Sequence, residues 1–190
     1  MGEQTTSAAN AIELRIEEIS QLFHTLDPFP FREKDLDTDA EEFIVSWARE
    51  LPPDQPLKIV VHVPEAQAST PEARELDGAL KRYFDHRAQA IRRELRELFR
   101  IGRRALAIGL TVLSLCIVGT QTVTTELRSP LGRFLGESLT IFGWVANWRP
   151  IEIFLYDWWP IVRRRNLYRR LSAAQVEVRP YKTQTRQQAV

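Results

Sequence analysis

Apolar and polar positions divide the chain into three parts: a mixed first half, an uncharged run, and an aromatic-rich segment with few charges. The uncharged run covers residues 105–124. A helix needs about 20 apolar residues to cross the roughly 30 Å of hydrocarbon in a bilayer. The run has this length, and so small a chain has little core with which to bury it on all faces. The pattern therefore predicts a transmembrane helix at residues 105–124.

The aromatic-rich segment, residues 135–160, predicts a second transmembrane helix. Arg149 and Glu152 lie three residues apart, so on a helix they can pair and share the cost of leaving water. Its tryptophans suit the two membrane interfaces. We expect a kink near Pro150, where the proline interrupts helical hydrogen bonding. The alternative is a half-membrane hairpin in which residues 150–159 lie flat in the interface.

Arginine clusters at the membrane boundaries predict the orientation. The connection between the two apolar segments, residues 125–134, has only Arg128 and Arg133. Positively charged residues stay on the cytoplasmic side. We therefore expect a multi-pass protein with both termini in the cytoplasm and an external loop at 125–134. The boundary arginines are Arg100, Arg103 and Arg104 before the first span, and Arg163, Arg164 and Arg165 after the second.

The region before the membrane segments is predicted to be a small cytoplasmic α/β region, residues 11–69, after a disordered N-terminus, residues 1–10. Residues 12–16 alternate apolar and charged side chains, which favours a half-buried strand, although helical spacing also fits. Residues 57–63 are rich in β-branched side chains and are closed by Pro64, so they predict another strand.

A helix is predicted to begin near Asp39, between these two strands. Thr38 and Glu41 have the spacing of a capping box, and the helix is expected to end at Pro52. Its expected apolar face consists of Phe43, Ile44, Trp47 and Leu51.

An amphipathic helix is predicted at residues 70–104, with Thr70 as its cap and Pro71 at its first position. Its apolar side chains recur at helical spacing. No helix breaker separates it from the uncharged run, so the two are expected to form one continuous helix.

The tail, residues 161–190, alternates at 175–179 and predicts a strand that pairs with 57–63 or 12–16. The predicted fold class is therefore an α+β membrane protein. It has a two-helix transmembrane hairpin, a small cytoplasmic α/β domain, and a long amphipathic helix leading into the first span.

Composition narrows the function. A formal net charge of +1 over 190 residues argues against a nucleic-acid binder. The single cysteine, Cys116, excludes an intramolecular disulfide and a cysteine-based zinc site. Familiar catalytic and nucleotide-binding motifs are absent. We predict no catalytic residues and no cofactor, and the chain leans away from being an enzyme.

The acidic residues Asp35, Asp37 and Asp39 have the spacing that opens a calcium loop. The sixth position is Ala40 where glycine is needed, and the twelfth is Ser46 where a bidentate glutamate belongs. Acidic residues at a helix start explain the run better, because they complement the helix dipole. No metal site is predicted.

Polar and aromatic residues of the second apolar segment form the candidate interaction site. Ionisable side chains inside a membrane are costly and therefore suggest function. The simpler interpretation is that Arg149 and Glu152 neutralise each other or hold protomers together. One arginine and one acid are few groups for an ion or proton path. The candidate residues are Trp144, Asn147, Trp148, Arg149, Glu152 and Asp157.

The stretches EEFIVSWARELP (41–52) and GWVANWRPIEIFLYDWWPIVRRR (143–165) resemble an uncharacterised family of small bacterial two-span inner-membrane proteins. The resemblance implies a cytoplasmic N-terminal region, two spans, an arginine-rich exit and a location in the cell inner (plasma) membrane. It implies no activity and no site residues.

The function expected from the sequence is that of a non-enzymatic membrane accessory or scaffold protein. Its partners would be the lipid bilayer and a second copy or another membrane protein, with helix 71–104 as a docking face. One alternative is a transport or channel subunit that uses Arg149 and Glu152. The other is a membrane-tethered enzyme built on Asp35, Asp37 and Asp39.

Overall fold

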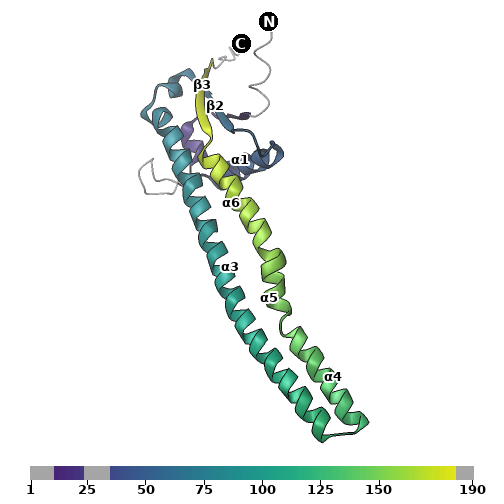
Figure 1. The fold of residues 1–190 in the computed structure, drawn as a ribbon. Helices are drawn as coiled ribbons and strands as arrows, with labels where there is room; N and C mark the ends of the chain where they lie inside the picture. The colour runs from purple at the N-terminus through teal and green to yellow at the C-terminus, as the bar shows by residue number, and fades with distance from the viewer. Residues whose placement is uncertain (1–10, 24–34, 183–190) are drawn as a thin grey trace, which may run out of the picture. The chain divides into compact units, whose positions relative to one another are not determined.

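A computed structural model describes residues 11–23 and 35–182; the predicted N-terminal segment 1–10 lies outside these residues. The chain is mostly helical, with one three-stranded parallel sheet (Figure 1). It divides into two compact units. Of the described residues, those up to residue 90 and those from residue 165 onwards form the sheet unit, and residues 91–164 form the hairpin unit.

The sheet is built from strands that are far apart in the sequence. Strand β1 (Ala11–Arg15) pairs with β2 (Lys58–Pro64), and β2 pairs with β3 (Gln175–Tyr181), in parallel throughout. The alternating and β-branched patterns thus predict all three strands. The tail strand pairs with β2, the first of its two expected partners. Ile59 and Val61 of β2 are fully buried, as is typical of a central parallel strand.

Helix α1 (Thr38–Glu50) begins one residue earlier than predicted, because Thr38, the predicted cap, is its first helical residue. Asp37 is the N-cap, and its side chain accepts a hydrogen bond from the backbone N–H of Asp39 at 3.0 Å. Aspartate is as good a cap as threonine, so the capping box expected from Thr38 does not form. The expected apolar face is also partly wrong. Ile44 is buried, but Phe43 and Trp47 are about half exposed.

Helix α3 (Pro71–Glu126) follows a short helix, α2 (Glu65–Ala68). The Thr70 hydroxyl accepts a hydrogen bond from the backbone N–H of Ala73 at 3.3 Å, which confirms the predicted cap. The helix is continuous over 56 residues, about 84 Å at 1.5 Å per residue, as the absence of a breaker predicts.

The first part of α3 is not an open docking face. Leu76, Leu80 and Phe84 have at most 1% of their surface exposed and belong to the core of the sheet unit. We expected the apolar side of this helix to be a docking face, but at these positions it is buried within the protein itself.

One helix in the described part of the chain, α3, is long and apolar enough to cross a membrane. Only 11% of its most apolar window is buried in the structure. A core helix of a soluble protein would be mostly covered, so this exposure favours membrane association.

The chain returns through several shorter helical pieces. These are α4 (Pro130–Val145), α5 (Trp148–Glu152), a π-helix (Ile153–Asp157) and α6 (Trp158–Ser172). The connection from α3 is shorter than expected, because α3 ends at Glu126 and α4 begins at Pro130. The helix break lies at Ala146 and Asn147, and not at Pro150. Pro150 lies in the first turn of α5, where its missing N–H leaves no partner unsatisfied.

Candidate functional site

Small residues line the seam between α3 and the returning helices. Seven-residue spacing places side chains on one face of a helix, and it recurs on both sides of this seam. All six positions are buried, and large side chains there would hold the backbones apart. They are Gly102, Gly109 and Cys116 on α3, and Gly136, Gly143 and Pro150 on the return.

Asn147 occupies the helix break and faces this seam. Its side chain is 5% exposed, and its Nδ2 donates hydrogen bonds to the carbonyl oxygens of Gly109 at 3.0 Å and Gly143 at 3.1 Å. Its Oδ1 is buried and accepts no conventional hydrogen bond from the described residues. A Cβ added to Gly109 would lie 2.6 Å from that oxygen, so a Cα hydrogen of Gly109 points at it. These contacts of Asn147 therefore hold the helix break against α3.

The contacts across the seam fix which residues lie level with one another. Gly143 lies against Leu113 and Cys116, Asn147 against Gly109, and Phe154 stacks on Phe99 with ring centroids 6.1 Å apart. Residues 149–157 therefore lie level with residues 98–107, where the uncharged run gives way to arginines. This register aligns Arg149 and Glu152 with the start of the uncharged run on α3.

Arg149 forms two ion pairs. The expected pair with Glu152 is present, with Nη1 and Oε2 3.1 Å apart, and a second pair joins Arg149 to Asp157 at 3.2 Å. In a straight α-helix, residues eight apart lie about 80° apart around the axis. The wider turn of the π-helix reduces this angle to within about 20°, which brings Asp157 onto the face of Arg149. The indole N–H of Trp148 also donates to Glu152 at 3.1 Å.

This charged group lies on the outer surface of the hairpin unit. The side chains of Arg149, Glu152 and Asp157 are 62%, 39% and 32% exposed. Trp144 and Trp148 are also more than 60% exposed. Of the six candidate residues, the structure thus joins Trp148, Arg149, Glu152 and Asp157. Asn147 instead faces the seam, and Trp144 is exposed on α4.

Large apolar side chains cover the outside of the hairpin unit. This arrangement reverses that of a water-soluble helical pair, which buries its large side chains and exposes its polar ones. Helix pairs in lipid pack small residues together and expose large apolar ones. Examples of the exposed side chains are Ile108, Leu115, Val118, Leu131, Phe134, Ile141, Phe142, Val145, Leu155 and Trp159.

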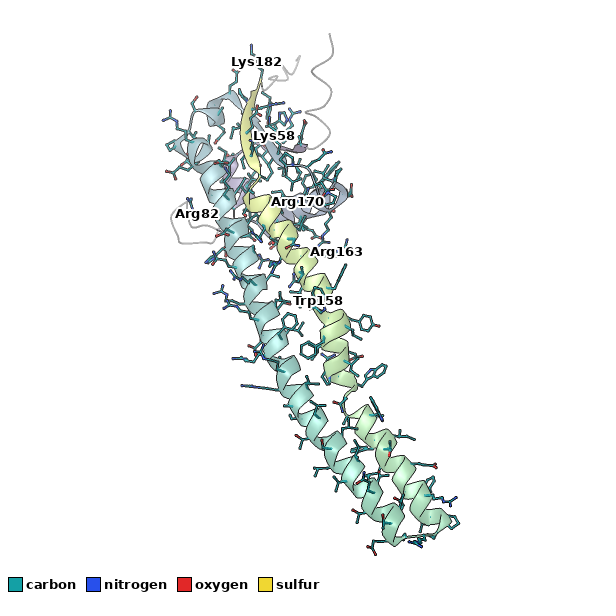
Figure 2. The ribbon with its side chains drawn as sticks, in the orientation of Figure 1. Lys58, Arg82, Trp158, Arg163, Arg170 and Lys182 are labelled. Atoms are coloured by element: carbon teal, nitrogen blue, oxygen red, sulfur yellow. The ribbon has the colours of Figure 1, made fainter. Side chains whose placement is uncertain are left out.

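The boundary arginines lie on α3 and α6. Arg100 pairs with Glu97, and Arg164 pairs with Glu94. Arg165 donates to the side-chain oxygen of Asn166 at 3.0 Å. Figure 2 shows Arg163 following Trp158 on α6. Arg103 and Arg104 immediately precede the uncharged run of α3.

A buried carboxylate in the sheet unit is a site that sequence reasoning missed. Glu41 of α1 accepts hydrogen bonds from the hydroxyls of Tyr83 on α3 and Tyr168 on α6, both at 2.6 Å. Arg87 of α3 donates to it through Nε at 3.1 Å and Nη2 at 2.9 Å. Each carboxylate oxygen thus accepts two hydrogen bonds, and three helices are joined at one side chain.

These contacts change the ionisation of the group. Burial acts to raise the pKa of Glu41, but the hydrogen bonds from Arg87, Tyr168 and Tyr83 outweigh it and hold that pKa below its usual value. Burial and the hydrogen bond to Glu41 raise the pKa of Tyr83. Glu41 is therefore ionised and fully paired, which suits a structural role better than proton transfer.

A small pocket adjoins this cluster. Its volume is about 260 Å³, and Glu41, Arg49, Arg87 and Tyr168 contribute to its lining. Ligand pockets usually span about 300–1,000 Å³ and have mostly apolar walls. The pocket therefore gives no argument for a small-molecule site.

The acidic run at the start of α1 is explained by capping. Asp37 caps the helix, and Asp39 lies in its first turn, where negative charge is favourable. Within residues 11–23 and 35–182, no group of three or more histidine, cysteine, aspartate or glutamate side chains could hold a metal ion. The local geometry thus gives no support to a catalytic role for the run.

Comparisons with protein-family models, with curated proteins and with solved structures gave no match.

Proposed function

We propose that the protein is a non-catalytic membrane scaffold whose residues 91–164 cross the bilayer as a two-helix hairpin. The observation that carries this proposal is the surface of the hairpin unit, with large apolar side chains outside and glycines along the seam. A soluble protein rarely exposes so large an apolar area.

The connectivity of the sheet supports two crossings over one. Strands β1 and β2 precede the hairpin and β3 follows it, yet all three form one sheet. Strands that pair in water must lie on the same side of a membrane. The chain between β2 and β3 therefore crosses an even number of times, so a crossing by α3 calls for a second crossing on the return.

The return offers enough length for that crossing. Residues 130–147 would span about 27 Å at 1.5 Å per residue, close to the roughly 30 Å of a hydrocarbon layer. Arg149, Glu152 and Asp157 would lie towards the boundary on the side of the sheet unit. Arg133 and Glu137, four residues apart on α4, would lie towards the opposite boundary. The arginine distribution supports a cytoplasmic location of the sheet unit.

The scaffold role rests on two surfaces. Phe43 and Trp47 form an exposed aromatic pair on α1, with ring centroids 6.1 Å apart, and could dock a cytoplasmic partner. The exposed aromatic side chains of Trp148 on α5 and Tyr156 on the π-helix could bind a second copy at the membrane boundary. A bacterial inner membrane as the location rests on the sequence resemblance alone.

The transport alternative has less support. A relay needs polar groups that line a path through the protein, but Arg149, Glu152 and Asp157 lie on its outer surface near one boundary. The enzymatic alternative also has less support, because Asp37 serves as a helix cap and Asp39 lies in the first turn of that helix.

Cysteine accessibility tests the hairpin directly. Single cysteines replace Ser69, Leu127 and Lys182 in a Cys116→Ala background, and intact cells are compared with inverted vesicles. We expect an impermeant maleimide to label position 127 only from outside, and positions 69 and 182 only from the cytoplasmic side. Labelling of positions 127 and 182 from the same side would overturn the proposal.

A further inference from the structure

A groove on α3 gathers several arginines beside the uncharged run. Its volume is about 690 Å³, and it is lined by Arg93, Arg96, Glu97, Phe99, Arg100 and Arg103. The arginines follow one another at intervals of three, four and three residues. This spacing places them along one strip of the helix.

The positive charge of this strip is only partly neutralised by neighbouring side chains. Glu97 is the single acid of the groove, and it pairs with Arg100. Among the described residues, Arg93, Arg96 and Arg103 take part in no hydrogen bond or ion pair. Like charges one turn apart on a helix repel, so the strip is most stable when it holds an anion.

The chemistry of the groove favours a phosphate group. Guanidinium groups match phosphate oxygens with paired N–H donors, better than lysine does. Four arginines and one glutamate leave a surplus of three positive charges. The aromatic ring of Phe99 adds an apolar wall to the groove. A free inorganic anion has no apolar surface to pack against this ring.

The place of the groove in the chain favours a lipid. Arg103 lies two residues before Ala105, the first residue of the uncharged run. Positions 93–103 extend about 15 Å along the helix axis, which is comparable to the depth of a headgroup layer. The next turns of α3 expose Ile108 and Leu110, which would contact the acyl chains.

We propose that this groove binds the phosphate of an anionic phospholipid in the leaflet on the side of the sheet unit. The inference rests on the proposed hairpin, which brings the groove to headgroup depth. The lipid would neutralise the arginine strip and fix the depth of α3, because basic residues next to a span are attracted to anionic headgroups.

The test uses purified full-length protein in a neutral detergent with fluorescent phosphatidylglycerol and fluorescent phosphatidylcholine. The groove variant is Arg93→Gln, Arg96→Gln, Arg103→Gln. The matched control, Arg92→Gln, Arg163→Gln, Arg165→Gln, loses the same charge outside the groove. We expect wild-type protein and the control to bind phosphatidylglycerol at least about tenfold more tightly than phosphatidylcholine, and the groove variant to lose this preference.

Three outcomes would overturn the inference. One is equal binding of the two lipids by wild-type protein, and another is an equal loss of preference in both triple variants. The third is complete displacement of phosphatidylglycerol by millimolar inorganic phosphate, which would indicate a site for a free anion. Failure of the hairpin itself would appear separately, as labelling of cysteines at positions 127 and 182 from the same side of the membrane.

Discussion

The side-chain amide of Asn147 donates a hydrogen bond to the backbone carbonyl of Gly109 across the helix seam, at 3.0 Å. The carbonyl oxygen of that amide lies where a side chain on Gly109 would begin. The two residues therefore depend on each other. The side chain of Asn147 fits only because Gly109 has no Cβ, and the carbonyl of Gly109 accepts a hydrogen bond from Asn147. This relationship explains why the return helix breaks where it does.

Gly109→Ala should destabilise the hairpin unit. The new Cβ would lie 2.6 Å from Asn147 Oδ1 and 3.0 Å from the carbonyl oxygen of Ala146, both too close for carbon. Overpacking of this kind costs about 1–3 kcal/mol. The measurement is thermal or denaturant unfolding of the full-length protein in detergent.

Gly78→Ala is the matched control on the same helix. There the nearest atoms belong to the flexible end of Arg82, at 3.3 Å. An alanine in a helix interior is favoured over glycine by about 1 kcal/mol, so this variant should be neutral or more stable. Equal stability of the two alanine variants would contradict the role assigned to Gly109.

Asn147→Ala should weaken the hairpin and partly relieve the clash at residue 109. Interhelical hydrogen bonds in membranes contribute about 0.6 kcal/mol on average, so the single variant should lose about that much. Combined with Gly109→Ala, the losses should be less than additive, because the obstructing oxygen is gone. A double-mutant cycle of unfolding free energies measures this coupling, and strict additivity would argue against it.

Glu41→Gln should lower the stability of the sheet unit at neutral pH. The substitution removes the charge that accepts from Tyr83, Tyr168 and Arg87, and hydrogen bonds to charged groups contribute about 1.5–3 kcal/mol. Because Arg87 is half exposed, we expect a loss of about 2 kcal/mol. Glu42→Gln, at the exposed neighbouring position, should change little.

The pH dependence of this loss follows from the pKa. The pKa of folded Glu41 is depressed below the ordinary value of 4.5, so its stabilising contribution is fully present above pH 4.5. The contribution disappears as the pH falls through the lower, folded-state pKa. The free energies of unfolding of wild-type protein and Glu41→Gln should therefore differ at pH 7 and converge only as the pH falls below the lowered pKa of folded Glu41. A difference that grows on acidification would show that the carboxylate is not stabilising.

Glu152→Gln combined with Asp157→Asn should leave membrane insertion within about twofold of wild type, since Arg149 lies near the boundary and can reach water or headgroups. Insertion is measured as the fraction of protein that resists alkaline carbonate extraction. Leu115→Arg is the control, because an arginine in the middle of a span costs about 2.5–3.5 kcal/mol. A severe insertion defect in the double variant would indicate that Arg149, Glu152 and Asp157 lie deeper in the membrane than their alignment with residues 98–107 implies.

Elements whose signals are local were predictable from the sequence. Alternation predicts β1 and β3, β-branched side chains predict β2, and three-residue spacing predicts the pair of Arg149 and Glu152. The shared feature is that each signal and its consequence lie within about one turn or one strand.

Features set by distant partners were not predictable. Glu41 is an ordinary acid in the first turn of a helix until Tyr83 and Tyr168, 42 and 127 residues away, close over it. The same orientation of α1 leaves Phe43 and Trp47 exposed. Likewise Pro150 is the obvious helix breaker locally, whereas the break is set by the contact of Asn147 with Gly109.

The order of strands has a consequence for synthesis of the protein. Because β3 lies at residues 175–181, one edge of β2 has no partner until the chain has passed through the hairpin and come back. In the proposed topology, a chain whose return segment failed to cross would leave β3 on the wrong side, with that edge of β2 open. Open edges invite aggregation and proteolysis. The sheet can therefore be completed only after both crossings have taken place. A protein inserted with the wrong topology would keep an incomplete sheet and be exposed to proteolysis.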